Sequence, residues 1–490
     1  MIEILKFTLI SIYLFCALSL MLYGLNAYVM MFLYKSHAKE AHLKKDEILD
    51  AFIRSKPEVL PKVTTQIPIY NEFNVAERVI RAACAMEYPD GNHEIQILDD
   101  SNDETKDIVD SVVTELIEKG HNIKVIRRKD RTGFKAGALA HGMETANGFF
   151  IAVFDADFVP QNDYLLKTIP FFLADEGLGL VQARWGHLNY KKSMLTRVQS
   201  IGIDGHFMIE QSARNWGNLF MNFNGTAGVW RKEAITDGGG WQWDTLTEDM
   251  DLSYRVQFKG WGTCYLPDLV VPAEIPEDIN AFKSQQFRWA KGSIETAIKL
   301  FPTLIKMDIS FFKKIEAFFH LTHYMVHPLM LTLAVLALPV MTLLDSLPGP
   351  LLFSSIAIVL LFSMSAPSAL YIMSQRVAYK NWASRLIYLP ALVVLGTGIA
   401  LSNTRAVFEA VVGKKSGFIR TPKRGDAHTK IYRAKLPVSA ILEILLGIYC
   451  SVSFVAYIYH GKYLVGPFLA IYAAAFLSTG FLTIFHLRFQ

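Results

Sequence analysis

Long apolar runs stand at both ends of the chain, and a stretch with a different pattern lies between them. The first run covers about residues 5–34, and five more follow residue 300, at about 318–344, 350–373, 386–401, 437–459 and 463–485. Between about residues 61 and 300, short β-rich runs alternate with amphipathic stretches. Because about 20 apolar residues are enough to cross a bilayer, the pattern predicts a soluble domain flanked by membrane-spanning helices.

The central stretch predicts an α/β domain. Its runs at residues 62–68, 94–98, 123–127, 149–154 and 178–183 are typical of buried strands, and those at 75–86, 104–119 and 136–145 of helices. Such alternation favours a largely parallel sheet, which binds ligands at the carboxyl ends of its strands. Three polar motifs close predicted strands there: residues 69–72 with Tyr70 and Glu72, residues 98–101 with Asp99 and Asp100, and residues 154–157 with Asp155 and Asp157.

Basic residues beside the apolar runs predict the topology. Lysines 35, 39, 44 and 45 follow the first run, which places the central domain in the cytoplasm and the N-terminus outside. The basic segment 414–435 is expected on the same side, so an even number of spans must separate it from the domain. We therefore interpret the short run 386–401, with residues 404–412, as a helix on the membrane surface, with a re-entrant hairpin as the alternative. About five spans and a cytoplasmic C-terminus follow.

Composition agrees with a protein that is part membrane and part soluble. The 52% hydrophobic content and mean hydropathy of +0.25 are high for a soluble protein, while 19% charged residues are too many for a pure membrane bundle. The net charge of +4 gives no reason to expect a nucleic-acid partner. The four cysteines lie far apart without a CxxC pair, which argues against a disulfide framework or a zinc site. The first apolar run lacks a clear cleavage site and is expected to be a retained anchor.

Asp155 and Asp157 flank Ala156 at the end of a wholly apolar predicted strand. Because side chains alternate along an extended backbone, both carboxylates should point to one side, where they can hold a hard cation such as Mg²⁺ or Mn²⁺. A solvated turn is the alternative. A second acidic pair, Asp99 and Asp100, also ends a strand, which favours a ligand site and predicts a contact with a nucleotide base or ribose, with a loop cap as the alternative.

Thr247, Glu248 and Asp249 open a predicted helix over residues 250–258, with Thr247 suited to the N-cap. Acids at a helix start are stabilised by the helix dipole, which is the structural explanation for this motif. A carboxylate in that place can also accept a proton from a sugar hydroxyl, and Asp249 can serve both purposes.

Arg288 and Trp289 end the motif QQFRW at residues 285–289. An arginine pairs with diphosphate oxygens in a two-pronged geometry, and a tryptophan stacks on the apolar face of a pyranose. Taken alone, the two residues are equally consistent with an Arg–Trp stack on a helix surface.

In this order the motifs resemble those of the processive, membrane-integrated family 2 glycosyltransferases, the group of cellulose, chitin and hyaluronan synthases. Their shared pattern is D, DxD, (T/V)ED and QxxRW. The likeness covers about residues 66–290 and is strongest to the cellulose synthase-like glucomannan and glucan synthases, through QIPIYNE at 66–72, GFKAGAL at 133–139, QARW at 182–185 and FNGTAG at 223–228. The resemblance implies a GT-A, Rossmann-like glycosyltransferase domain inserted in an α-helical transmembrane bundle.

The resemblance also implies a role for each matched residue. Donor and nucleotide binding would involve Tyr70, Glu72, Asp99, Asp100, Lys135, Asp155 and Arg288, a divalent metal would be held by Asp155 and Asp157, and Asp249 would be the general base. The acceptor would be bound by Phe223, Asn224, Gly225, Thr226, Glu248, Gln285 and Trp289. Phe418, Thr421 and Lys423 are similar to a gating loop over the nucleotide, although Arg420 replaces the usual valine.

These roles imply a metal-dependent, inverting hexosyltransferase. It would move a hexose from UDP-glucose or GDP-mannose to a growing β-glycan and pass the polymer through the membrane. One alternative is a non-processive enzyme that glycosylates a membrane lipid, similar to ceramide glucosyltransferases, and another is a transporter with an inactive sugar-binding domain. The expected partners are the nucleotide sugar, a glycan or lipid acceptor and membrane lipid.

The expected location is the inner (cytoplasmic) membrane of a bacterium, with the catalytic domain in the cytoplasm. The expected parts are a first transmembrane helix at 1–35, a linker at 36–60 and the glycosyltransferase domain at 61–300. An interfacial helix with two transmembrane helices is expected at 301–385, an interfacial helix with the gating segment at 386–436, and two transmembrane helices at 437–490.

Overall fold

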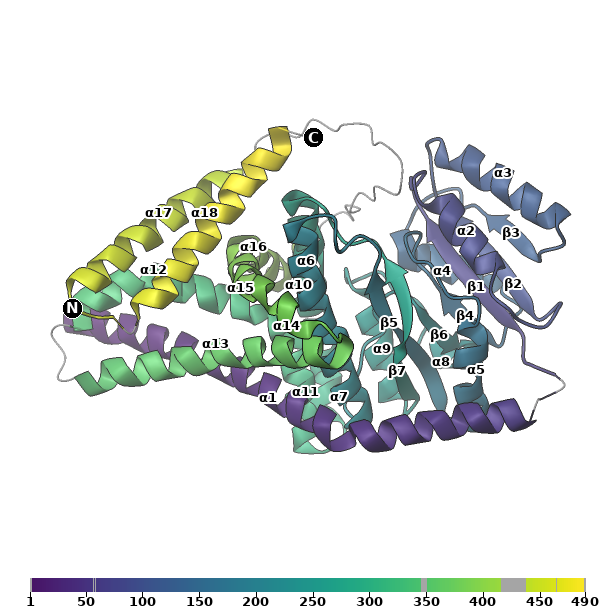
Figure 1. Ribbon diagram of the computed structural model, residues 1–490, viewed down its shortest axis with the longest axis horizontal. Helices are drawn as coiled ribbons and strands as arrows, with labels where there is room; N and C mark the ends of the chain where they lie inside the picture. The colour runs from purple at the N-terminus through teal and green to yellow at the C-terminus, as the bar shows by residue number, and fades with distance from the viewer. Residues whose placement is uncertain are drawn as a thin grey trace.

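The computed structural model describes residues 2–55, 57, 59–344, 350–415, 438–463 and 465–488. Figure 1 shows a sheet covered by helices at one end of the molecule and a group of long helices at the other, with helix α1 running along both parts. The gating-loop residues expected at Phe418, Thr421 and Lys423 lie outside the described residues.

The strands and helices have the following bounds. The strands are β1 (Val63–Ile69), β2 (His93–Asp99), β3 (Ile123–Ile126), β4 (Phe150–Val153), β5 (Leu178–His187), β6 (Gly228–Arg231) and β7 (Gly262–Ala273). The helices up to β7 are α1 (Ile2–Ser55), α2 (Ala76–Cys84), α3 (Thr105–Glu118), α4 (Phe134–Glu144), α5 (Tyr164–Ala174), α6 (Met194–Asp204), the π-helical η1 (Gly205–Glu210), α7 (Gln211–Trp216), α8 (Lys232–Asp237) and α9 (Glu248–Phe258). The remaining helices are α10 (Ile279–Lys306), α11 (Phe311–Thr322), η2 (His323–Met325), α12 (Val326–Leu344), α13 (Pro350–Ala378), α14 (Trp382–Arg385), η3 (Leu386–Tyr388), α15 (Leu389–Gly398), α16 (Ala400–Val411), α17 (Val438–Tyr459) and α18 (Gly466–Arg488).

The seven strands form one sheet in the order β3-β2-β1-β4-β6-β5-β7. Four neighbouring pairs are parallel, whereas β6 is antiparallel to both β4 and β5. All five strands predicted from the sequence form, so the α/β domain is confirmed. Strands β6 and β7 were not predicted, and β6 makes the sheet mixed.

Helices cover both faces of this sheet. One face carries α2, α3 and α5 and the other α4, α8 and α9, so the central strand β4 is buried along its whole length. Helix α2 shows why the sequence folds this way, because its buried residues recur every three or four positions and form one apolar face: Ala76, Val79, Ile80 and Ala83. Because β1 is parallel to both β2 and β4, the carboxyl ends of these three strands meet at one edge of the sheet, where the predicted polar motifs lie.

The chain contains several helices that can cross a membrane. Within the described residues, four helical segments are long and apolar enough: Glu3–Ser55, Phe311–Thr342, Val438–Tyr459 and Gly466–Leu487. A fifth is added if the bent pair Trp382–Gly398 and Ala400–Val411 counts as one span. The run expected to span at 350–373 forms α13, which is not among these segments and packs along α1 (Figure 1).

The segment expected to lie on the membrane surface is a bent pair of helices. Helices α15 and α16 meet at an angle of 41°. Helix α15 packs on α6 and α18, while α16 packs on α10 and α12. Gly398 permits the contact with α18, because a Cβ at this position would lie 1.9 Å from Thr479 Oγ1. The pair therefore lies between the central domain and the long helices.

Helix α10 links the two parts of the molecule. It begins at an N-cap, Asp278, whose side chain accepts a hydrogen bond of 2.8 Å from the Ala281 amide. One turn later, the buried Lys283 Nζ lies 2.5 Å from Glu443 Oε1 on α17. Because the QQFRW motif follows directly, α10 carries this motif to the boundary between the sheet domain and the membrane helices.

Candidate active site

A cavity of about 190 Å³ lies at the carboxyl edge of the sheet. It is bordered by the loops after β1, β2 and β4 and by residues of α4, α9 and α10. Residues that the sequence assigned to the donor, the metal, the base and the acceptor line it together: Tyr70, Glu72, Asp100, Lys135, Asp155, Asp157, Glu248, Asp249, Gln285, Arg288 and Trp289. Residues from six separate parts of the chain therefore meet in one place.

Lys135 stands among the carboxylates of this cavity. Its Nζ donates to Asp155 Oδ1 at 2.5 Å and to the Gly225 carbonyl at 2.7 Å, and lies 4.0 Å from Glu248 Oε1. Burial alone would lower the pKa of Lys135, but Asp155 and Glu248 raise it above its usual value. The ammonium group thus stays charged and can pair with phosphate oxygens.

Asp249 lies in the first turn of α9, beside these charges. Burial raises the pKa of Asp249 to about 7, the neighbouring Glu248 carboxylate adds to the rise, and Lys135 opposes it. Asp249 Oδ1 accepts a hydrogen bond of 2.8 Å from the Met250 amide, which fixes the side chain. A carboxyl group with a pKa near neutrality is suited to take up a proton during a reaction.

Gly225 allows the backbone to approach this carboxyl group closely. Its φ of 82° lies in the left-handed region, and a Cβ here would stand 2.9 Å from Asp249 Oδ2. The following residue, Thr226, accepts a hydrogen bond of 2.9 Å from the Asp155 amide through its Oγ1. The loop after Phe223 therefore braces both Asp155 and Lys135.

Phe223 and Thr226 stabilise this loop from inside the core. Both are fully buried and line neither cavity of the site, although the sequence assigned them to the acceptor. The Phe223 ring packs edge-on against Trp230 at 5.5 Å. Of the same motif, Asn224 and Gly225 do lie on the cavity wall.

Thr247 occupies the N-cap position of α9, as predicted, but its side chain does not cap the helix. Its hydroxyl instead lies 3.0 Å from Thr296 Oγ1 on α10. The expectation of a side-chain cap is wrong because the hydroxyl finds a tertiary partner. The contact holds the start of α9, and with it Asp249, against α10.

The two aspartates after β2 are separated by the structure. Asp99 accepts hydrogen bonds from the Ser101 amide at 3.0 Å and from Arg127 Nε at 2.8 Å, and it does not line the cavity. Asp100 pairs with Arg128 through two hydrogen bonds and does line it. A donor contact is thus possible for Asp100, while Asp99 shapes the loop.

Arg131 is a residue of the cavity that the sequence reasoning missed. Its guanidinium lies 3.3 Å from the centre of the Tyr70 ring, and both residues line the cavity. The signal was present, because the polar segment that follows β3 contains three arginines in five residues, at 127, 128 and 131.

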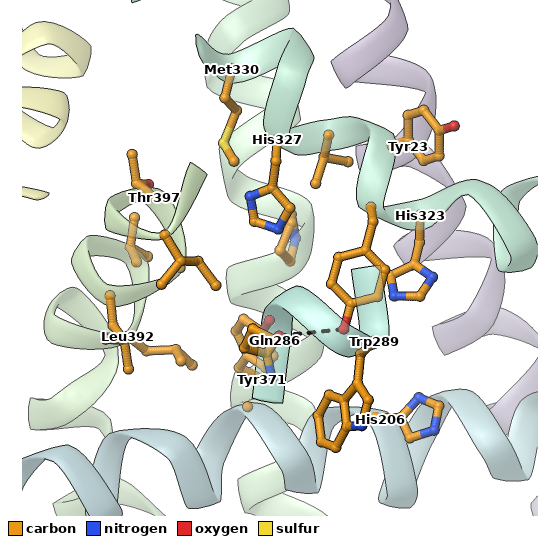
Figure 2. A pocket seen from close by; sticks show the side chains of 18 of the residues that line it. Tyr23, His206, Gln286, Trp289, His323, His327, Met330, Tyr371, Leu392 and Thr397 are labelled. Carbon is orange, nitrogen blue, oxygen red and sulfur yellow. Dashed lines mark hydrogen bonds between the residues drawn. The ribbon is translucent and has the colours of Figure 1, made fainter. Parts of the chain in front are cut away.

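A second and larger cavity, of about 580 Å³, continues from the first towards the membrane helices. Its walls come from α6, α10, α12, α15 and neighbouring segments, and Figure 2 shows some of these residues, among them Trp289, His327 and Leu392. The two cavities share part of their lining, including Trp185, Asn224, Asp249, Gln285 and Trp289. Asp249 therefore lies where the two spaces meet.

Two tryptophans stand at this junction. The rings of Trp185 and Trp289 are 6.4 Å apart at an angle of 55°. Trp289 belongs to the predicted motif, whereas Trp185 lies near the carboxyl end of β5 and was noted only as part of QARW. Nearby, Gln286 Oε1 accepts a hydrogen bond of 3.3 Å from the Tyr324 hydroxyl (Figure 2). Aromatic faces with polar groups between them are typical of sugar-binding sites.

Asp155 and Asp157 are suited to hold a divalent metal that binds together with a phosphate-containing ligand. No three His, Cys, Asp or Glu side chains gather to hold an ion within the described ranges. Magnesium, however, is commonly held by one or two carboxylates together with substrate phosphates and water. Both aspartates line the small cavity beside Lys135, so the donor set suits such an ion.

Comparison with known proteins decides the family. The family model described as "Glycosyltransferase like family 2" matches residues 61–292. Probable glucomannan 4-beta-mannosyltransferase 10 of Arabidopsis thaliana is 32% identical over 473 residues, which cover 92% of this chain and 83% of that protein. The chain belongs to the cellulose synthase-like family 2 glycosyltransferases. Its α/β domain has the GT-A glycosyltransferase fold, and its apolar helices make it an integral membrane protein.

Other similarities are more limited in extent. Probable glucomannan 4-beta-mannosyltransferase 7 of Oryza sativa subsp. japonica is 45% identical over 259 residues, or 52% of this glycosyltransferase and 44% of the rice protein, so the alignment spans less than half of that relative. A solved structure, a mannosyltransferase from Pyrobaculum calidifontis in complex with GDP-Man and Mn²⁺, gives a TM-score of 0.45 at 18% identity. It covers 79% of this chain and 99% of its own, and a likeness at this level carries no argument about function.

Proposed function

We propose that this glycosyltransferase moves a hexose from a nucleotide sugar to a growing β-glycan, with inversion at the anomeric carbon. The observation that carries the proposal is the place of Asp249, a partly buried carboxyl with a pKa of about 7, between a small charged cavity and a larger one that leads to the membrane helices. The names of the plant relatives favour mannose over glucose as the transferred sugar.

The donor would bind in the small cavity. Lys135 and Arg288 supply the positive charge for its diphosphate, and Arg131, stacked on Tyr70, lies on the same wall. A divalent metal held by Asp155 and Asp157 would supply further charge for the diphosphate when bound. Burial lowers the pKa of Arg288, while Glu248 and Asp155 work against that effect.

The acceptor would enter from the larger cavity. Trp289 and Trp185 offer apolar faces for pyranose rings, and Gln285 offers an amide for their hydroxyl groups. Asp249 takes the proton of the attacking hydroxyl as its oxygen bonds to the anomeric carbon. The bond to the diphosphate breaks in the same displacement, so an α-linked donor yields a β-linked product without a protein nucleophile.

The larger cavity is also the space into which a lengthening product would pass. Its walls include residues of α12 and α15 and segments of the C-terminal helices, so a polymer leaving Asp249 would move towards the membrane. We infer that the sheet domain lies in the cytoplasm, where nucleotide sugars are made. The bacterial membrane expected from the sequence has no support from the relatives named above, which are plant proteins.

Labelled donors test this function directly. Membranes that contain the protein are incubated with radiolabelled GDP-mannose or UDP-glucose, and the product is divided into solvent-extractable lipid and insoluble glycan. We expect mannose in an insoluble fraction that β-mannanase releases. Label found only in the lipid extract would instead support glycosylation of a membrane lipid, which the many apolar residues of the larger cavity also accommodate.

The Asp249→Asn variant tests the assigned base in the same assay. The amide keeps the shape of the side chain but does not accept the proton, so transfer should fall by roughly a hundredfold to ten-thousandfold. Asp163→Asn, an exposed aspartate at the N-terminus of α5, is the matched control and should transfer normally. Full transfer by Asp249→Asn would rule out Asp249 as the base.

A further inference from the structure

His206 lies on the wall of the larger cavity and has no part in the mechanism above. It belongs to the six-residue π-helical segment η1, between α6 and α7, and its side chain is 30% exposed. π-Helical turns are rare and occur frequently at functional sites. Figure 2 shows His206 and Trp289 as lining residues of the same cavity.

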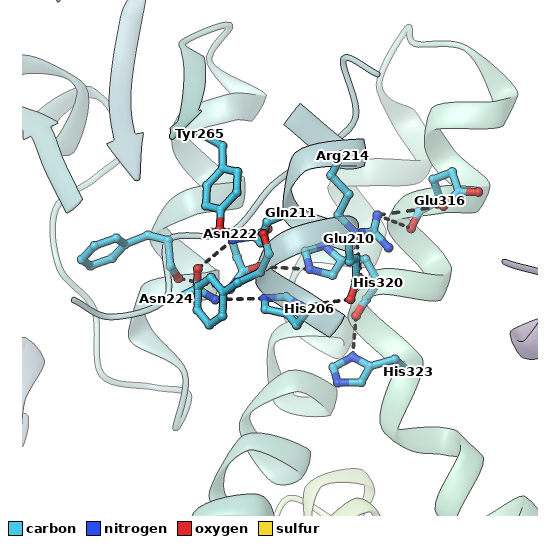
Figure 3. Close-up of polar contacts among 12 residues, drawn as sticks. His206, Glu210, Gln211, Arg214, Asn222, Asn224, Tyr265, Glu316, His320 and His323 are labelled. Atoms are coloured by element: carbon cyan, nitrogen blue, oxygen red, sulfur yellow. Dashed lines mark hydrogen bonds and ion pairs between the residues drawn. The ribbon is translucent and has the colours of Figure 1, made fainter. Parts of the chain in front are cut away.

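Hydrogen bonds determine which ring nitrogen of His206 carries the proton. Nδ1 lies 3.0 Å from Glu210 Oε2, and because an ionised carboxylate only accepts, Nδ1 is the donor. Nε2 lies 3.2 Å from Asn224 Nδ2 and accepts from this amide. The neutral ring is thus held between Glu210 and Asn224 (Figure 3).

Glu210 is held in its ionised form. Burial alone would raise the pKa of Glu210, but Arg214, with Nε 3.0 Å from Oε1, holds it well below its usual range with the help of His206. Arg214 is itself buried, and its NH1 donates to the Glu316 carbonyl on α11 at 3.4 Å. The support behind His206 therefore reaches from η1 to a membrane helix.

The amide of Asn224 is fixed from two sides. Its Oδ1 accepts a hydrogen bond of 2.7 Å from Gln211 Nε2, and its Nδ2 donates to His206. An amide nitrogen has two hydrogens, so the second one remains for a ligand. Asn224 lines both cavities, immediately before Gly225 in the loop that faces Asp249.

We propose that His206 is a positioning residue for the acceptor sugar. Held by Glu210, it orients the Asn224 amide so that the second N–H of that amide binds a hydroxyl of a neutral pyranose whose ring packs on Trp289. This inference rests on the proposed function, because it names residues that hold the acceptor of that reaction. It assigns to the π-helical segment a role in acceptor binding and leaves donor binding to other residues.

The His206→Ala variant tests this role on the full-length protein purified in detergent. Labelled GDP-mannose is the donor and mannotetraose, a neutral β-linked oligosaccharide, is the acceptor. Loss of one anchor of Asn224 should raise the acceptor KM about tenfold, as expected for one weakened hydrogen bond. The donor KM and the slow hydrolysis of donor without acceptor should not change, since His206 does not line the donor cavity.

Two further variants separate positioning from folding. In His206→Gln the side-chain carbonyl can still accept from Asn224 Nδ2, so most of the acceptor affinity should return. His141→Ala is the matched control, because His141 also faces a glutamate, Glu144 at 3.4 Å, but lies on the exposed surface of α4. If His206→Ala also loses donor hydrolysis, the loss indicates a folding defect. The acceptor KM of His206→Gln, compared with that of the wild type, then tests the role of His206 instead.

The outcomes distinguish this inference from the proposed function. An acceptor KM that is unchanged in His206→Ala, or a donor KM that rises with it, contradicts the role of His206. If the wild type transfers no sugar to mannotetraose, the proposed function fails, and binding of mannotetraose is then followed by tryptophan fluorescence. Weaker binding in His206→Ala supports the inference, whereas equal binding, or none by the wild type, overturns it.

Discussion

Asp249 shows how the surroundings of one carboxyl group prepare it for chemistry. An exposed aspartate is ionised at neutral pH but is a weak base. Burial and the adjacent Glu248 raise the pKa of Asp249 to about 7, and Lys135 limits the rise. Proton transfer is most effective when the pKa of the base lies near the working pH. The close approach of the Gly225 backbone then leaves the carboxyl group little freedom to move.

The dependence of activity on pH follows from that pKa. Asp249 must be ionised to act as a base, so kcat/KM for the donor should fall about tenfold for each unit of pH below about 7 and level off above it. In Glu248→Gln the neighbouring negative charge is lost, which lowers the pKa of Asp249 and should move the acidic limb to lower pH. A limb that stays in place in Glu248→Gln, or a flat profile from pH 5 to 8, would contradict this account.

Single residues of the site were predictable to the extent that chemistry alone selects them. Residue type and spacing pointed to Asp155 and Asp249, and the family resemblance added Lys135; the structure brings all three together in one cavity. The sequence did not predict that Asp100 lines the cavity whereas Asp99 does not, because this difference depends on which arginine each aspartate pairs with, Arg128 for Asp100 and Arg127 for Asp99. Likewise, the placement of Phe223 in the core depends on the packing of β6, a strand that local pattern did not reveal.

At the scale of elements, five of the seven strands were predicted from local pattern, and β6 and β7 were missed. Strand β4 is buried on both faces and has four apolar residues in succession. Strand β6 has only four residues, starts with a glycine and ends with an arginine, and β7 contains Pro267 and Pro272 with a break in its pairing to β5. Pairing with distant strands, rather than local propensity, makes these two segments extended.

Helix α10 depends on a contact that local sequence patterns do not reveal. Lys283 and Glu443 are 160 residues apart in the chain, yet they form a buried ion pair of 2.5 Å between α10 and α17. Lys283→Met would leave the Glu443 charge buried without its partner and should cost about 3 kcal/mol of stability. A lower thermal unfolding midpoint of the purified protein would show this loss.

A double variant checks the origin of that effect. Lys283→Met combined with Glu443→Leu removes both charges, so most of the lost stability should return. Lys167→Met breaks an exposed pair with Asp163 of similar length, 2.6 Å, and should leave the unfolding midpoint unchanged. A double variant that is less stable than Lys283→Met alone would show that the pair does not act in this way.

At the scale of the whole molecule, the central feature is the connection between the two cavities. The smaller one carries the charged groups of the GT-A domain, and the larger one leads between α6, α10, α12 and α15. The QQFRW motif stands at their boundary because α10 carries it from the sheet domain to the membrane helices. Membership of the family accounts for the apolar helices that flank the catalytic domain. In the proposed function, the connected cavities give a product formed at Asp249 a path to these helices.

The configuration of the newly formed bond tests the central claim most directly. The purified protein is supplied with GDP-mannose, in which the sugar is α-linked, and with mannotetraose, and the product is analysed by NMR. A single displacement at a carbon that faces Asp249 predicts a lengthened oligosaccharide whose new linkage is β. An α-linkage, or consumption of GDP-mannose without any lengthened oligosaccharide, would contradict the account.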